Sequence, residues 1–125
     1  MIILDTSVWI EFLKNNPLFS PQVKALLEQQ EVLGVEWIFG ELLQGAADKR
    51  EKGIILSYWE NIRRFDSLGA WIEAGIFFSE QRMHSKGVGI IDCAIVIAAR
   101  RTHSRIWSLD KKLNNILTEQ EKYTV

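Results

Sequence analysis

Cysteine is nearly absent from this sequence, and histidine is sparse. Cys93 is the single cysteine, so no disulfide can form within the chain. A composition of this kind is expected in a reducing cytosol. His84 and His103 are isolated from each other and from Cys93, so no group of residues has the spacing of a zinc site. A disulfide scaffold and a zinc centre are therefore excluded.

The sequence also has no long apolar run. The longest run, Val88–Ala99, is too short to span a bilayer and contains Asp92. The apolar start, Met1–Leu4, has no basic residue and ends at Asp5, which is unlike a secretion signal. We therefore expect a cytoplasmic protein that does not associate with a membrane.

No excess of either charge is present. The chain has 15 Lys and Arg residues against 16 Asp and Glu residues, which gives a formal net charge of −1. Nucleic-acid-binding proteins often show a strong basic excess. Any site for a polyanion on this protein must therefore be a local basic patch or a bound metal ion. Hydrophobic residues make up 47% of the chain, which is enough to build a core.

Proline is limited to Pro17 and Pro21, and no repeat, linker or low-complexity tract divides the 125 residues. We therefore expect one domain, residues 1–125. Short apolar runs alternate with helical patterns, which predicts a parallel sheet covered by helices on both faces. The pattern places strands at 2–4, 32–35, 65–68 and 105–109 and helices at 6–14, from Ser20 onward, and at 36–47, 49–64, 70–85, 91–102 and 111–117. Thr6 or Ser7 is the expected cap of the first helix, and Ser20 that of the second.

Three aspartates occupy strand ends or helix starts. Asp5 follows the first predicted strand, Asp110 follows the last, and Asp92 opens a nearly all-apolar helix. Ligands of parallel α/β sheets bind at the carboxyl ends of the strands. Each aspartate also has a simpler interpretation, because Asp is a preferred helix cap and an anion is favoured at a helix N-terminus.

Glu41 lies on an apolar stripe of its predicted helix. The stripe has the spacing of a buried face and consists of Trp37, Ile38, Glu41, Leu42 and Gly45. A buried carboxylate must be paired, protonated or bound to a cation, because burying it bare is costly. The alternatives are that Glu41 lies at the edge of the stripe with its carboxylate in solvent, or that it forms a salt bridge to an arginine.

Four carboxylates brought together repel one another, and a divalent cation removes this repulsion. Mg²⁺ takes oxygen ligands, keeps several waters and binds few protein carboxylates together with phosphate oxygens. Such an ion activates water for attack on a phosphodiester. We therefore predict that Asp5, Glu41, Asp92 and Asp110 converge on one Mg²⁺-binding pocket, in which Mn²⁺ can substitute.

Four segments of the sequence resemble the PIN-domain family, and within it the VapC-type toxins of bacterial type II toxin–antitoxin systems. The segments are ILDTSVWIEFL at the start, ELLQGA around Glu41, GIIDCAIVIAA around Asp92 and RIWSLDKKL around Asp110. The resemblance extends over nearly the whole chain. It implies a three-layer α/β/α sandwich with a short parallel sheet and a Mg²⁺-dependent endoribonuclease activity.

The resemblance also implies roles for individual residues. Asp5, Glu41, Asp92 and Asp110 fall on the family's acidic positions, with Asp5 and Asp92 as direct metal ligands. The hydroxyl groups of Thr6, Ser7 and Ser108 are expected to support the pocket. Toxins of this kind are usually homodimers, held inactive by a cognate antitoxin that lays a segment across the pocket and can insert an arginine there.

The last motif departs from the family pattern. The family often has a second Asp and a Phe after the fourth acid, whereas this chain has Lys112 and Leu113. Asp110 is therefore the only acid of that motif, which makes a second metal ion less secure than the first. Lys111 and Lys112 lie beside the predicted site and are candidates for contacts to RNA phosphates.

Two other classes of function compete with a ribonuclease. A PIN scaffold with weak catalysis could act as a protein- or RNA-binding module. The presence of Lys112 where the family often has an Asp favours this alternative. A phosphate-transfer protein on another doubly wound fold is the second alternative. A haloacid-type phosphatase requires a second Asp two residues after the first, and position 7 is Ser.

Overall fold

A parallel β-sheet forms the centre of the protein. We describe it from a computed structural model that covers all 125 residues, Met1–Val125. Strand β1 (Ile2–Leu4) pairs with β4 (Arg105–Trp107), and β2 (Leu33–Gly34) pairs with β3 (Arg63–Arg64). A parallel bridge between Ile2 and Val32 joins the two pairs, so the strand order is β3-β2-β1-β4.

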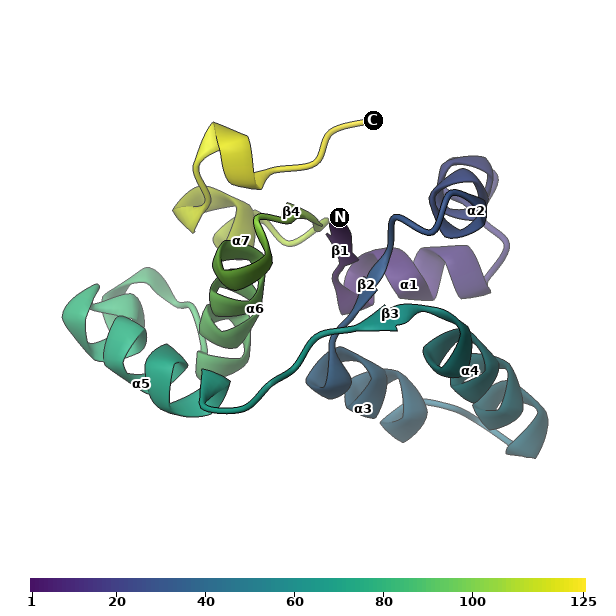
Figure 1. The fold of residues 1–125 in the computed structure, drawn as a ribbon, viewed down its shortest axis with the longest axis horizontal. Coiled ribbons are helices and arrows are strands. Elements are labelled where there is room, and N and C mark those ends of the chain that lie inside the picture. Colours follow the sequence, from purple (N-terminus) through teal and green to yellow (C-terminus); the bar gives the residue numbers. More distant parts are fainter.

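Helices cover both faces of this sheet. In chain order they are α1 (Thr6–Leu13), α2 (Ser20–Glu28), α3 (Glu36–Gln44), α4 (Lys49–Asn61), α5 (Ala70–Glu80), α6 (Ile90–Thr102) and α7 (Lys111–Ile116), with short 3₁₀ turns η1 (Met83–Lys86) and η2 (Glu119–Glu121). Figure 1 shows the strands near the middle, α5, α6 and α7 to the left, and α1 to α4 to the right. The predicted α/β/α arrangement with a short parallel sheet is confirmed.

Helix α6 passes through the core. Residues 93–99 are all buried, as expected for a helix that is apolar on every side. A second part of the core is aromatic, because Trp9 packs against Phe12, Phe39 and Tyr58 with ring centroids 5.1–6.0 Å apart. These contacts hold α1, α3 and α4 together and fix the position of the residues that follow β1. No helix is both long enough and apolar enough to cross a bilayer.

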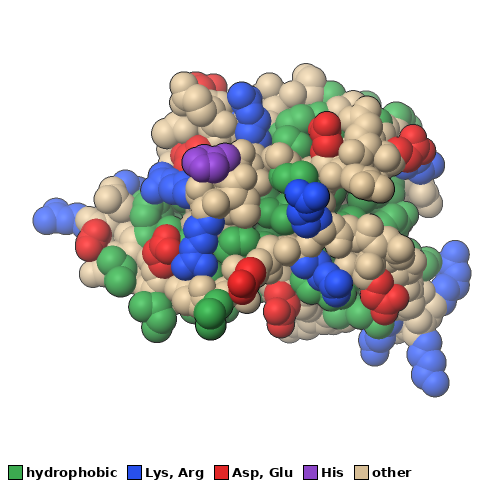
Figure 2. Space-filling model, in the orientation of Figure 1, with side chains coloured by type: hydrophobic (Ala, Val, Ile, Leu, Met, Phe, Trp, Pro, Cys, Tyr) green, Lys and Arg blue, Asp and Glu red, His purple; other side chains and the backbone are tan.

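The surface carries charges of both signs. On the face drawn in Figure 2, basic and acidic side chains are interspersed, and no continuous basic field covers it. Large apolar side chains protrude from α5, where Trp71, Ile72 and Ile76 are 41%, 73% and 53% exposed. Other exposed apolar side chains, such as Leu18 and Leu68, are spread over the rest of the surface, and α5 is the only helix that presents three of them.

Several predicted boundaries were wrong for local reasons. Asp5, rather than Thr6 or Ser7, caps α1, and Phe19 precedes α2 in place of a Ser20 cap. The strand expected at 65–68 is two residues earlier, at Arg63–Arg64. The helix expected at 70–85 ends at Glu80, because Arg82 adopts a left-handed backbone conformation with φ of 52°. The other differences are shifts of one to three residues, to be expected because helix ends fray.

Candidate active site

Asp5 is fixed at the carboxyl edge of the sheet. Its carboxylate is buried and accepts hydrogen bonds from the backbone N–H of Ser7, at 2.7 Å, and from the hydroxyl of Ser108. The first bond caps α1, and the second joins the ends of β1 and β4. The backbone N–H of Asp5 also donates to the carbonyl of Trp107 at 3.0 Å. The position of Asp5 is thus set by the start of α1 and by the end of β4.

Glu41 lies at the surface, which corrects the prediction that it is buried on an apolar stripe. Ile38 and Leu42 are buried, whereas Glu41 is exposed on the side of α3 next to them. Its Oε1 accepts a hydrogen bond from Thr6 Oγ1 at 3.0 Å. This contact brings Glu41 to the start of α1, beside Asp5. The hydroxyl of Thr6 was predicted to support the site.

Asp92 has the most perturbed carboxylate in the protein. It lies in the first turn of α6 and is half-buried. Its pKa is raised to about 6, first by burial and then by the charges of Asp110, Asp5 and Glu41, while a backbone hydrogen bond involving Gly89 opposes the rise. The charges of the other three predicted site acids therefore all act on Asp92.

Asp110 is exposed and caps α7. Its Oδ1 accepts from the backbone N–H of Lys112 at 2.9 Å. Its own N–H donates to the hydroxyl oxygen of Ser108 at 3.0 Å, so Ser108 links Asp110 to Asp5. Ser7 adds a further link, because its hydroxyl oxygen accepts from the N–H of Leu109 at 3.1 Å.

Asn114 also holds this turn, although it was not among the predicted site residues. Its side-chain N–H group donates to the carbonyls of Ser108 and Asp110, at 2.9 and 3.1 Å. Its sequence position could have indicated this role, because Asn114 lies four residues after Asp110 and residues with this spacing are neighbours on a helix. Asn114 therefore positions the turn that carries both Ser108 and Asp110.

The donor set suits a hard divalent cation. All four charged groups are carboxylates, and Asp92 is destabilised in its ionised form by the other three. As the side chains stand, no three of the Asp, Glu, His or Cys groups are close enough together to hold a single ion. Mg²⁺ binds through one or two protein carboxylates with waters in the remaining positions, so Asp5 and Asp92 fit it as ligands.

The two lysines named as RNA-contact candidates lie at the start of α7, and both are exposed. Lys111 makes no hydrogen bond or ion pair. The side chain of Lys112 lies against Gly87, where an added Cβ would come within 3.4 Å of its ammonium nitrogen. Neither lysine is among the charges that shift the pKa of Asp92. Both are therefore free to meet another anion.

Fold and site together define a parallel α/β protein with acidic side chains at the carboxyl edge of its sheet. The sequence profile of the PIN domain matches residues 2–117, and the chain belongs to this family. PIN domains are generally nucleases, which supports a hydrolase that acts on nucleic acid. The crystal structure of FitAcB from Neisseria gonorrhoeae has the same fold, with a TM-score of 0.62, 21% sequence identity and 90% of each chain covered. No curated protein sequence matches the chain significantly.

Proposed function

We propose that this protein is a Mg²⁺-dependent endoribonuclease and the toxin of a type II toxin–antitoxin pair. The observation that carries the proposal is the cluster of four carboxylates in which Asp5, Glu41 and Asp110 all raise the pKa of Asp92. A pocket of this kind repels a phosphodiester unless a cation lies between them. The order of the four acids along the chain is that of the VapC-type toxins, which supports RNA as the substrate.

In this proposal Asp5 and Asp92 would hold the ion, and when bound the ion would supply Lewis-acid polarisation of the phosphate and acidification of a water molecule. Glu41 and Asp110 would orient water molecules near these two carboxylates. Thr6 and Ser108 keep their carboxylate partners in place through the hydrogen bonds described above.

An antitoxin partner is part of the proposal. A cavity of about 550 Å³ lies between α1, α3 and α4, and Glu41 is among its lining residues. A partner segment seated there would reach the acidic pocket, where an arginine from it could pair with the carboxylates. The exposed apolar residues of α5, Trp71, Ile72 and Ile76, offer a surface that a second copy of the chain would cover in a homodimer.

Cleavage of RNA by the purified protein tests the proposal. Labelled single-stranded RNA should be cut in the presence of Mg²⁺ or Mn²⁺, and a chelator should stop the reaction. Asp5→Asn should abolish cleavage, whereas Glu60→Gln, which removes an exposed carboxylate on α4, should leave it unchanged. Equal cleavage by Asp5→Asn and the unmodified protein would overturn the site, and preferential cutting of DNA would overturn the choice of substrate.

A catalytically weak binding module is the second candidate, and Lys112 in place of an acid is the observation that favours it. The two candidates differ in what happens to bacterial growth. Expression of an Asp5→Ala/Asp92→Ala variant should not inhibit growth if catalysis is the cause of toxicity. Inhibition retained by this variant would instead support action through binding alone.

A further inference from the structure

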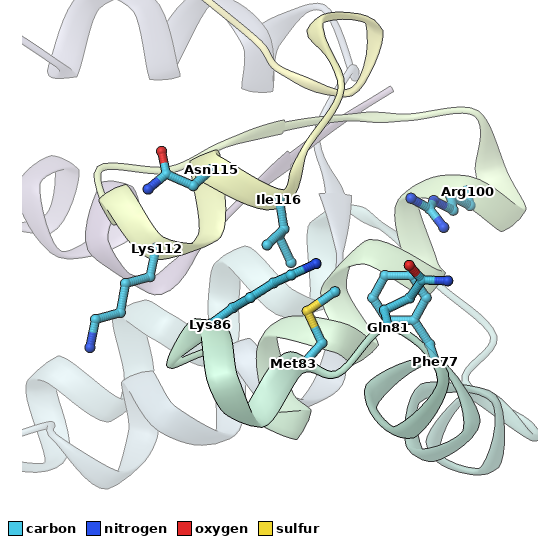
Figure 3. A pocket seen from close by; sticks show the side chains of 8 residues that line it. All are labelled: Phe77, Gln81, Met83, Lys86, Arg100, Lys112, Asn115 and Ile116. Carbon is cyan, nitrogen blue, oxygen red and sulfur yellow. The ribbon is translucent and has the colours of Figure 1, made fainter.

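A cation-lined cavity lies apart from the four carboxylates. It has a volume of about 730 Å³ and is enclosed by the C-terminal half of α5, η1, α6 and α7. Figure 3 shows its lining side chains, which are Phe77, Gln81, Met83, Lys86, Arg100, Lys112, Asn115 and Ile116. Three of these carry positive charge, and none is acidic. In a protein with a net charge of −1, this concentration of one sign is notable.

The charge of the cavity is not cancelled within the fold. Arg100 is the only one of the three cations with an ion-pair partner, Glu121 at 2.8 Å, and its guanidinium also lies 5.0 Å from the ring centre of Phe77. Lys86 and Lys112 make no ion pair. Figure 3 shows Lys86 reaching toward Ile116 across the cavity, while Lys112 extends outward at its edge. The cavity therefore retains the charge of two free ammonium groups.

The chain connects this cavity directly to the acidic pocket. Lys112 follows Asp110 by two residues, and its backbone N–H is bound to the Asp110 carboxylate at 2.9 Å. Lys86 precedes Gly87, whose left-handed conformation turns the chain toward Gly89 and the first turn of α6. The turn that carries Lys86 thus leads to Asp92, and the helix that carries Lys112 begins at Asp110.

From this arrangement we infer that the cavity holds a nucleotide of the RNA strand adjacent to the cleaved phosphodiester. Lys86 and Lys112 each bind a phosphate of the strand, and Phe77 and Ile116 contact the base. The inference rests on the proposed ribonuclease function, and it adds a binding site for the strand outside the carboxylate cluster.

The chemistry and size of the cavity match this ligand. Its volume is within the range of small-ligand sites, roughly 300–1,000 Å³. Lysines bind phosphates without reading sequence, and bases pack on aromatic and apolar side chains. The side-chain amides of Gln81 and Asn115 have no hydrogen-bond partner in the protein, so both are available to base or sugar atoms. A protein partner would find little apolar surface here, because five of the eight lining residues are polar or charged.

Binding of a short fluorescein-labelled oligouridylate tests the inference. The assay uses the full chain with Asp5→Asn, in chelator, so that the RNA stays intact, and follows anisotropy over a range of salt concentrations. Adding Lys86→Gln and Lys112→Gln should weaken binding about tenfold and reduce the slope of log affinity against log salt by about 1.4, which is about 0.7 for each lost phosphate contact on a single strand. The matched control is Lys49→Gln with Lys52→Gln, which removes two exposed cations from α4 and should change neither quantity.

Cleavage assays separate this inference from the proposed function. In protein that retains Asp5, the Lys86→Gln/Lys112→Gln pair should raise KM for RNA about tenfold and leave kcat nearly unchanged. Unchanged binding and unchanged KM would overturn the cavity as an RNA site, even if the protein cleaves RNA. If RNA binding is unchanged while an oligoglutamate peptide binds through these lysines, the cavity serves a protein partner and the inference is also overturned. If the protein binds RNA through these lysines but cleaves none, the proposed function is contradicted and the inference about the cavity is not.

Discussion

Thr6 Oγ1 donates a hydrogen bond to Glu41 Oε1 at 3.0 Å, and this bond joins the start of α1 to the exposed side of α3. The two residues are 35 positions apart, and neither carboxylate nor hydroxyl is buried. The bond stabilises the fold little, because exposed hydrogen bonds compete with water. Its effect is to hold a flexible glutamate near Asp5 and Asp92.

Thr6→Val should therefore affect activity more than stability. Loss of an outer residue that orients a side chain of a metal site typically reduces metal affinity or activity by about 10- to 100-fold. We expect a reduction of RNA cleavage at the lower end of this range, and a change in unfolding free energy below about 0.5 kcal/mol. Thr6→Ser keeps the hydroxyl and should retain most activity. If Thr6→Val and Thr6→Ser cleave equally well, the bond has no role in the site.

Ser108→Ala should lower the stability of the protein as well as its RNA cleavage. The Ser108 hydroxyl is buried, donates to Asp5 Oδ2 and accepts from the N–H of Asp110. Its removal leaves a buried carboxylate oxygen without that donor, at a cost of about 1–3 kcal/mol. Chemical denaturation of the variant should show this loss, while Ser57→Ala, at an exposed position on α4, should unfold like the unmodified protein. Equal stability of the two variants would show that Asp5 does not depend on Ser108.

Asp92→Asn should stabilise the metal-free protein at neutral pH. The pKa of Asp92 is raised in the folded state from 3.8 to about 6, so the folded state holds its proton more tightly than the unfolded state does. The resulting stability is fully present below pH 3.8 and is lost as the pH rises through about 6. The amide cannot ionise, so the variant keeps this stability, and we expect a gain of about 1–2 kcal/mol after allowance for solvent screening.

Denaturation in chelator at a series of pH values measures this gain. The difference between Asp92→Asn and the unmodified protein should be small near pH 4 and constant above about pH 6. Addition of Mg²⁺ should reduce or reverse the difference, since the ion stabilises the folded unmodified protein by binding to it. A difference that is the same at all pH values would mean that ionisation of Asp92 in its buried, acidic surroundings is not its cause.

The sequence was sufficient to predict the parallel sheet and the residues at its carboxyl edge. Asp5 and Asp110 each follow a short apolar run, and in a parallel sheet such positions necessarily lie at one edge. The burial of Glu41 was predicted wrongly because helical periodicity indicates which face a residue is on, but not how far the neighbouring element extends over that face. How deeply Glu41 is buried depends on where α1 and α4 pack against α3, which is a property of the tertiary structure.

Other features could not be read from local sequence. The break between α5 and η1 depends on Arg82 adopting a left-handed conformation, which arginine seldom does and which no residue pattern announces. The cavity lined by Lys86, Arg100 and Lys112 draws its charges from three elements that are distant along the chain. Scattered basic residues in a sequence of nearly zero net charge are usually surface decoration, so only the fold reveals that these three line one cavity.

Calorimetric titration with Mg²⁺ and Mn²⁺ is the most direct test of the claim that the four carboxylates form one cation site. The unmodified protein should bind at least one ion, and Asp5→Asn and Asp92→Asn should each weaken binding at least about tenfold, because direct ligands contribute more than the residues that orient them. Glu60→Gln should bind the ion like the unmodified protein. Absence of binding, or equal binding by all four proteins, would contradict the account.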